Sequence, residues 1–145
     1  MTYIIVSCLL MFTSCGDIES IDSTFDQIKI KDDIDKFIEA HEKSDCEEAK
    51  AYVIALKASK AKDAFWPLNK YHIYKKNYEE LSELISNNPE NIRMRYARLL
   101  ILEKVPGFLR NELDMDSDKS FLDLEMRQSG FPNHLKDLIK KNTSL

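Results

Sequence analysis

Glycine is scarce in this chain, with only Gly16, Gly107 and Gly130 among 145 residues. Loops that cradle phosphate groups and the tight turns of β-hairpins use glycine for backbone conformations that other residues avoid. So few glycines argue against a nucleotide-binding loop and against a turn-rich β fold. With 43% hydrophobic residues, the chain can bury one core, and it is too short for two ordinary domains.

Histidine and cysteine are also few and scattered. None of His41, His72 and His134 stands at a metal-binding spacing from a second histidine or a cysteine. Cys46 has only His41 near it in the sequence, and no third residue is evident that would orient such a pair. The sequence therefore shows no catalytic constellation, and we expect a protein that is not an enzyme.

Charged residues are absent from residues 1–14, MTYIIVSCLLMFTS, and every Lys, Arg, Asp and Glu lies beyond Cys15. The apolar run from Tyr3 to Phe12 has the length of a signal-peptide hydrophobic region, and it is too short to cross about 30 Å of hydrocarbon as a helix. We therefore expect residues 1–14 to be a signal peptide and not a transmembrane anchor. The alternative is a buried N-terminal helix or strand.

The end of this run resembles a bacterial lipoprotein signal. Thr13 and Ser14 fit the small positions that precede the lipidated cysteine, and the Gly-Asp pair after Cys15 resembles the start of a Bacteroidetes lipoprotein tether. The resemblance implies that Cys15 is lipidated, that Cys46 is left as the single free cysteine, and that no internal disulfide forms. It also implies a membrane-anchored location in the cell envelope, at the outer membrane and facing the periplasm or the exterior.

Apolar residues recur at steps of three and four through most of the remaining chain, which indicates α-helices. Prolines and acidic residues stand where such helices begin or end. We predict helices over residues 32–41, 45–65, 68–86, 92–104, 118–128 and 133–141. Short connections make successive helices antiparallel, so we expect an all-α fold, an antiparallel α-hairpin array of about five to six helices. Residues 15–31 are assigned to the lipidated cysteine and a tether that merges into a helix, and residues 32–145 to the helical domain.

Two stretches resemble known helical families. Residues 87–91, NNPEN, weakly resemble the joint between tetratricopeptide repeats, although no second 34-residue copy is present. A longer stretch resembles a family of short, all-helical Bacteroidetes proteins without an assigned activity. The residues that carry this second resemblance are Ile92, Arg93, Arg95, Arg98, Pro106, Phe108, Leu109, Asp118 and Lys119. It implies an all-helical fold and an organism group, and it adds no chemistry.

The most specific candidate site is residues 114–125, DMDSDKSFLDLE. Aligned with the calcium loop of an EF-hand, this stretch offers carboxylates at positions one, three, five and twelve. These are Asp114, Asp116, Asp118 and Glu125. Lys119 stands where the turn of the loop favours glycine, and it brings a positive charge beside the site. The alternative is that the acidic residues only cap a helix and interact with its positive N-terminal end.

Although the net charge of the chain is -4, the middle of the sequence carries more basic than acidic residues. Residues 16–49 hold twelve acidic and four basic residues, residues 50–110 hold six and twelve, and the remainder holds seven and five. We expect the basic helices to pair with the acidic N-terminal segment or to face anionic lipid and glycan phosphates. A nucleic-acid partner is not expected, because the tyrosines among the basic residues stand at helical core spacing and a lipoprotein meets no genomic nucleic acid.

These observations predict a lipid-anchored, extracytoplasmic helical interaction module of the bacterial envelope. Besides the membrane, its expected partner is another envelope protein or an anionic envelope polymer. Arg93, Arg95 and Arg98 are the predicted contact residues, and they recur too closely to share one helix face. The alternative is a calcium-binding helical domain that uses residues 114–125, and no other cofactor is expected.

Overall fold

Helices make up the regular structure of this chain wherever it is described. The computed structural model describes residues 15–145, which form seven α-helices and two short 3-10 helices and contain no strand. The α-helices are α1 (Ile18–Asp26), α2 (Lys31–His41), α3 (Glu47–Ser59), α4 (Pro67–Asn87), α5 (Ile92–Lys104), α6 (Glu112–Met126) and α7 (Asn133–Asn142). The 3-10 helices are η1 (Lys60–Asp63) and η2 (Gly107–Leu109). The all-α prediction is confirmed, whereas the tetratricopeptide resemblance is not. The predicted signal peptide, residues 1–14, lies outside the described residues.

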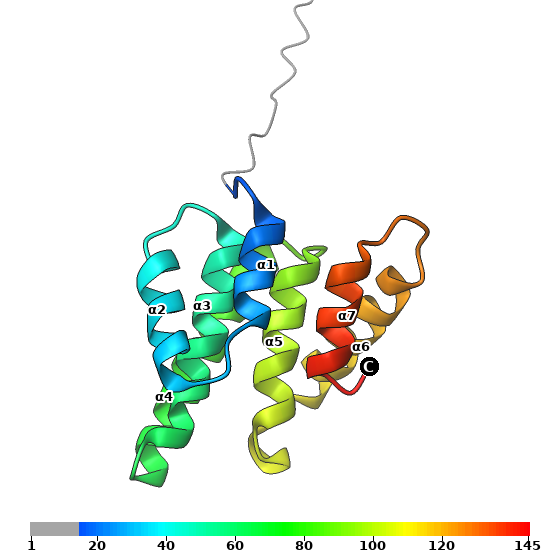
Figure 1. Ribbon diagram of the computed structural model, residues 1–145. Helices are drawn as coiled ribbons and strands as arrows, with labels where there is room; N and C mark the ends of the chain where they lie inside the picture. Colours follow the sequence, from blue (N-terminus) through cyan, green and yellow to red (C-terminus); the bar gives the residue numbers. More distant parts are fainter. Residues whose placement is uncertain (1–14) are drawn as a thin grey trace, which may run out of the picture.

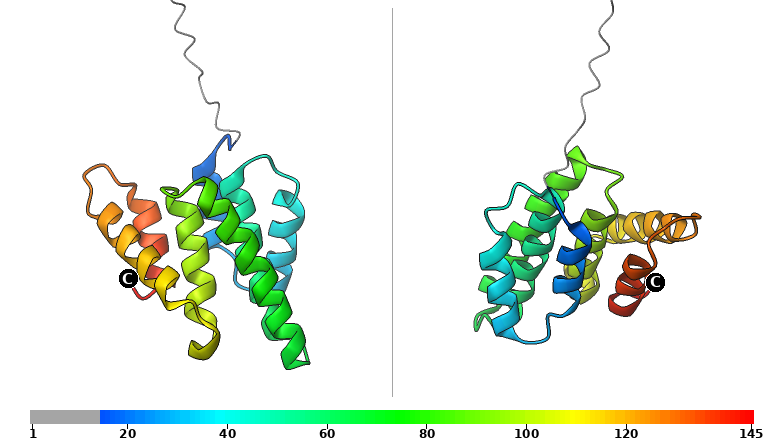
Figure 2. Two further views of the ribbon diagram at one scale, coloured as in Figure 1. Left: turned by 180° about the vertical axis from the view of Figure 1, so that it is seen from behind. Right: turned by 45° about the horizontal axis from the view of Figure 1, so that its top comes forward.

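Successive helices run in opposite directions and form an open array (Figures 1 and 2). α3 lies at its centre and packs against α2, α4 and α5, and α5 also packs against α6. Because the direction alternates, α1, α3, α5 and α7 all end at the same end of the molecule, where α2, α4 and α6 begin. We call it the lower end, after its place in Figure 1, and the chain enters α1 from the opposite, upper end.

The central helix α3 is buried on nearly all sides. Residues 51–56 are all buried, and Tyr52 has no exposed surface. A helix that lies on the surface keeps one polar face, so burial around the whole circumference marks a helix enclosed by others. The alanines of α3 leave room for these neighbours to approach.

α1 is part of the packed domain, although the sequence analysis assigns residues 15–31 to a tether. The ring of Phe25 in α1 stacks on the ring of Tyr52 in α3, with ring centroids 4.2 Å apart. This contact is part of the main core, because Tyr52 is a fully buried member of the core and Phe25 packs against it. The predicted domain boundary at residue 32 is therefore corrected to Ile18. Residues 15–145 form seven α-helices where the sequence predicts five to six, and α1 is the additional helix.

α6 begins earlier than the acidic residues suggest. Asn111 caps the helix, because its side-chain oxygen accepts a hydrogen bond from the backbone N–H of Asp114 at 3.1 Å. Asp116 and Asp118, the residues expected near the helix start, lie in its second turn instead. Residues 114–125 are consequently helical throughout.

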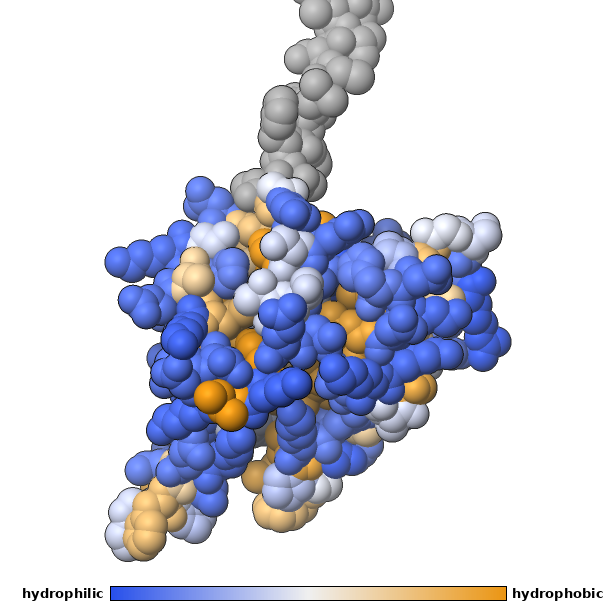
Figure 3. Space-filling model, viewed as in Figure 1, coloured by the Kyte–Doolittle hydropathy of each residue, from blue (hydrophilic) through white to orange (hydrophobic). Residues whose placement is uncertain are grey.

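Polar and charged side chains cover most of the face shown in Figure 3, and apolar surface appears on both projections at the lower end. Within residues 15–145, no helix combines the length and the apolar composition needed to span a bilayer.

Candidate functional site

The first of the three arginines predicted to bind a partner is held by a carboxylate inside the molecule. Arg93 on α5 donates hydrogen bonds to both carboxylate oxygens of Asp22 on α1, and its Nη2 lies 2.6 Å from Oδ2. Asp22 is only 1% exposed, and it also accepts a hydrogen bond from the Tyr52 hydroxyl at 2.7 Å. His134 Nε2 lies 3.1 Å from the same carboxylate. The expected pairing of the basic middle with the acidic N-terminal segment is thus present here, and one carboxylate joins α1, α3, α5 and α7.

Arg95 and Arg98 share a second buried carboxylate. Nε and Nη2 of Arg98 each lie 2.7 Å from an oxygen of Asp118 on α6, and Arg95 Nη1 lies 3.1 Å from the same group. The Asp118 side chain has no exposed surface, and those of Arg95 and Arg98 are 15% and 7% exposed. Asp114 approaches Arg98 at 3.5 Å and accepts a hydrogen bond from the Tyr78 hydroxyl.

The buried pair of Asp22 and Arg93 is ionised in the folded protein. Burial raises the pKa of Asp22, but the hydrogen bonds from Arg93 and Tyr52 and the charge of Arg93 outweigh this effect, so the pKa lies below its ordinary value. Burial lowers the pKa of Arg93, and the same carboxylate more than compensates, so this pKa is raised. The binding role of the three arginines stays a prediction, and in this structure their guanidinium groups are engaged within the fold.

The four carboxylates of the calcium alternative do not converge on one point. In a helix, residues two apart do not share a face, so Asp116 points away from Asp114 and Asp118, which are four residues apart and both approach Arg98. In residues 15–145, only one group of three His, Cys, Asp or Glu residues has ligand atoms within 4.8 Å of one another, and it lies elsewhere. The calcium alternative stays a prediction from the sequence. A rise in melting temperature on calcium addition that Asp116→Ala abolishes would support it.

That one group consists of Cys15, Cys46 and Glu48, and its two cysteines form a disulfide. Because α1 lies against α3, residue 15 comes close to the N-terminus of α3, where Cys46 is the capping residue. The expectation that Cys46 stays free and unpaired is therefore corrected. Cys15 Sγ can carry either the disulfide or a lipid thioether, so the predicted lipidation and this disulfide exclude each other. A closed disulfide also leaves no thiolate for metal binding or nucleophilic attack.

Reduction of this disulfide is expected to lower the free energy of unfolding by about 3 kcal/mol. The physical reason is that the two cysteines are 31 positions apart in sequence, and the unfolded chain regains the conformational freedom of the segment between them. Urea unfolding with and without reductant measures the effect, and reductant should not change the stability of the Cys46→Ser variant. Alkylation and peptide mapping of protein from its native host would contradict the disulfide if Cys15 carried a lipid.

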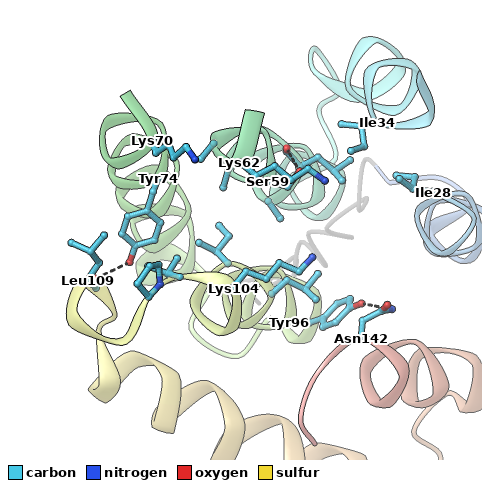
Figure 4. Close-up of a pocket in the computed structure, with 18 of the residues that line it drawn as sticks. Ile28, Ile34, Ser59, Lys62, Lys70, Tyr74, Tyr96, Lys104, Leu109 and Asn142 are labelled. Atoms are coloured by element: carbon cyan, nitrogen blue, oxygen red, sulfur yellow. Dashed lines mark hydrogen bonds between the residues drawn. The ribbon is translucent and has the colours of Figure 1, made fainter. Parts of the chain in front are cut away.

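A cleft of about 890 Å³ opens at the lower end of the helical array. Its walls come from the last turns of α1, α3 and α7, from α5, from the first half of α4, from η1 and η2, and from Ile34 of α2 (Figure 4). The apolar lining includes Phe25, Ile28, Ile34, Leu56, Leu100, Ile101 and Val105. Three tyrosines, Tyr71, Tyr74 and Tyr96, also line the cleft. Two of their hydroxyls are already bonded, because Tyr74 donates to the carbonyl of Leu109 at 3.3 Å and Asn142 donates to Tyr96 at 3.1 Å. The cleft thus has a largely apolar interior.

Lysines surround this apolar interior. Those that line the cleft are Lys29, Lys62, Lys70, Lys104 and Lys141. Among the lining residues the only acid is Asp26, which pairs with Lys141 at 2.8 Å. Within residues 15–145, the ammonium groups of the other four lysines have no carboxylate within 4 Å. Figure 4 shows Lys62, Lys70 and Lys104 around the opening, on η1, α4 and α5. This lysine rim is positively charged on a chain whose net charge is -4.

The electrostatics of helix ends explain only part of the lysine rim. Lys104 and Lys141 lie in the last turns of α5 and α7, where a positive charge complements the carbonyl end of the helix. Lys70, by contrast, lies at the start of α4, and Lys29 lies just before α2. A helix N-terminus disfavours a cation, so helix stability does not account for these two positions.

No protein-family model, curated protein or solved structure matches this chain. The function is therefore inferred from the geometry and chemistry of the cleft.

Proposed function

We propose that this chain is a non-catalytic binding module of the bacterial envelope, whose cleft takes up a small amphipathic anion with an apolar body and a carboxylate head. The proposal depends on one observation, an apolar cleft of about 890 Å³ surrounded by five lysines. Pockets for small organic ligands occupy about 300–1,000 Å³. Burial of an apolar body contributes about 25 cal/mol per Å², and the lysine rim favours a negative head group.

Both parts of the cleft are needed to select this ligand class. A neutral apolar molecule would fill the interior and make no use of the lysines. An acidic polymer would contact the lysine rim and leave the apolar walls in water. A single-chain carboxylate uses the walls and the rim together, and it places its charge at the open side, where water still solvates it.

Two features support a location in the envelope. Residues 1–14 lack charge and directly precede Cys15, as the signal peptide of an exported chain would. Disulfides persist in oxidising compartments outside the cytoplasm. A lipid on Cys15 would also place the chain in the envelope. Both the disulfide-bonded and the lipidated form of Cys15 are therefore consistent with the proposed location. We assign the membrane anchor only to a lipidated form in which the disulfide is open.

The disulfide also supports a non-catalytic role. A cysteine nucleophile at position 46 would require a free thiolate, and the Cys46 sulfur is bonded to Cys15.

Laurate is expected to bind the full chain in isothermal titration calorimetry, and dodecanol and dodecyltrimethylammonium are expected to bind about tenfold more weakly. The three probes share one alkyl chain, so the difference reports the preference for a negative head group. The Lys70→Ala/Lys104→Ala variant is expected to lose about tenfold in laurate affinity, since each exposed charge pair contributes up to about 1 kcal/mol.

The matched control is Lys76→Ala/Lys140→Ala, which removes two exposed lysines that do not line the cleft. It should bind laurate as the unaltered chain does. Equal affinity for all three probes, or full laurate affinity without Lys70 and Lys104, would contradict the proposal.

A further inference from the structure

The lower end of the molecule exposes four large apolar side chains in two segments. Phe65, Trp66 and Leu68, at the start of α4, are 85%, 64% and 65% exposed, and Phe108 in η2 is 87% exposed. We call these four residues the apolar tip. The two segments lie beside the same cleft, because Pro67 and Phe108 both line it. In Figure 1 both lie at the lower end, and Figure 3 shows the apolar surface there.

Packing within the domain does not explain the apolar tip. The rings of Phe65 and Trp66 meet edge to face, with centroids 5.1 Å apart, and none of the four side chains belongs to the main core. Single exposed apolar residues are common on soluble proteins. Four that gather at one end of a small domain form the kind of patch that marks an interaction site.

The charges around the tip identify the kind of surface it suits. Lys62 and Lys70 flank the first segment and Lys104 precedes the second, and their ammonium groups have no carboxylate within 4 Å in residues 15–145. Aromatic side chains beside lysines are typical of segments that lie in the head-group region of a bilayer. Protein interfaces also favour aromatic residues, but they are depleted in lysine. We infer that the apolar tip docks reversibly on an anionic bilayer surface.

Docking in this orientation would bring the mouth of the cleft to the bilayer surface, where amphipathic anions concentrate. The chain enters α1 at the opposite, upper end of the molecule (Figure 1), and Cys15 precedes α1 by three residues. A lipid on Cys15 would therefore enter a different bilayer surface from the one that the tip meets. The inference therefore concerns the chain with the Cys15–Cys46 disulfide closed. It does not depend on the cleft ligand, because vesicle binding and laurate binding are separate measurements.

Trp66 makes the inference directly measurable, since it is the only tryptophan in the chain. The full chain with its disulfide closed is mixed at low salt with vesicles of phosphatidylcholine, either pure or containing phosphatidylglycerol. With the anionic vesicles, Trp66 emission is expected to shift to shorter wavelength and to become protected from acrylamide quenching. Raising the salt concentration should reverse both changes, because salt screens the attraction of the lysines to the lipid phosphates.

The Phe65→Ala/Leu68→Ala variant is expected to bind anionic vesicles at least about tenfold more weakly in co-sedimentation, because it removes two apolar side chains from the docking surface. Neither residue lines the cleft, so laurate affinity should not change. The control is Leu113→Ala/Leu124→Ala, which removes two side chains that are 82% and 62% exposed on α6. This control should bind vesicles as the unaltered chain does.

Three results would overturn the inference. The first is unchanged Trp66 emission with anionic vesicles at low salt. The second is equal vesicle binding by the tip variant and the unaltered chain. The third is self-association without vesicles that the tip variant abolishes, which would assign the apolar tip to a contact between copies of this chain.

Discussion

Replacement of Asp118 by alanine is expected to lower the free energy of unfolding by about 4 kcal/mol. Asp118 is the carboxylate that Arg95 and Arg98 share, and its side chain has no exposed surface. Without it, Arg98 keeps a positive charge in a site where its side chain is 7% exposed. Among residues 15–145, the partly exposed Asp114, at 3.5 Å, is the only other carboxylate within 4 Å of Arg98. Urea unfolding followed by far-ultraviolet circular dichroism measures the loss.

Asp116→Ala is the matched control, because it removes the same side chain two residues away in α6. Asp116 is exposed, and exposed substitutions usually change stability by less than about 0.5 kcal/mol. Since an apolar pair can replace a buried ion pair at little cost, Arg98→Met/Asp118→Leu should recover much of the stability that Asp118→Ala loses. Equal effects of Asp118→Ala and Asp116→Ala would show that the buried network does not hold α5 and α6 together.

Local sequence pattern predicts much of this fold. The period of three to four residues and the positions of Pro67, Pro89 and Pro132 place the predicted helices that correspond to α2, α4, α5 and α7 close to their true bounds. The helix predicted over residues 45–65 is α3, which ends at Ser59 and is followed by the 3-10 helix η1. The positions of helix ends are harder to predict from the sequence, because several polar residues near an end can serve as the cap. At α6 the cap is Asn111, and the more conspicuous acidic residues that follow it lie inside the helix.

Contacts between distant residues could not be predicted in the same way. The sequence shows that Asp22 and Arg93 have opposite charges, but 71 positions separate them, and only the packing of α1 against α3 and α5 brings them together. The disulfide depends on the same packing. Assignment of residues 15–31 to a tether therefore concealed both the Asp22 pair and the partner of Cys46.

The cleft was missed for a related reason. Its lysines come from separate elements along the chain, from Lys29 before α2 to Lys141 in α7, so no local motif contains them. The excess of positive charge in residues 50–110 is visible in the sequence, but the closely spaced arginines of α5 are its most conspicuous part and were the predicted contact residues. One signal was available: Lys70 follows Pro67, which begins a helix, and a lysine in that position opposes the helix dipole.

Replacement of Asp22 by asparagine is expected to lower the free energy of unfolding by about 3 kcal/mol at pH 7, because Arg93 then loses its buried partner. The effect should depend on pH in a defined direction. The pKa of Asp22 is lowered in the folded protein, and an aspartate in an unfolded chain has a pKa of about 3.9. The unfolded state therefore binds the proton first as the pH falls, and the contribution of Asp22 is complete above this pKa and lost as the pH falls through the folded value.

The difference in stability between the unaltered chain and Asp22→Asn should therefore be constant near neutral pH and shrink below about pH 4. The control is Asp26→Asn, also on α1, which removes a carboxylate that pairs with Lys141 where both side chains are substantially exposed. A pair of this kind contributes at most about 1 kcal/mol. Urea unfolding of the unaltered chain, Asp22→Asn and Asp26→Asn at a series of pH values measures how the effect of each substitution depends on pH. A difference for Asp22→Asn that stayed constant down to pH values well below 4 would mean that the ionised carboxylate does not hold α1 in place, and other contacts of α1, such as the aromatic packing of Phe25 on Tyr52, would then have to do so.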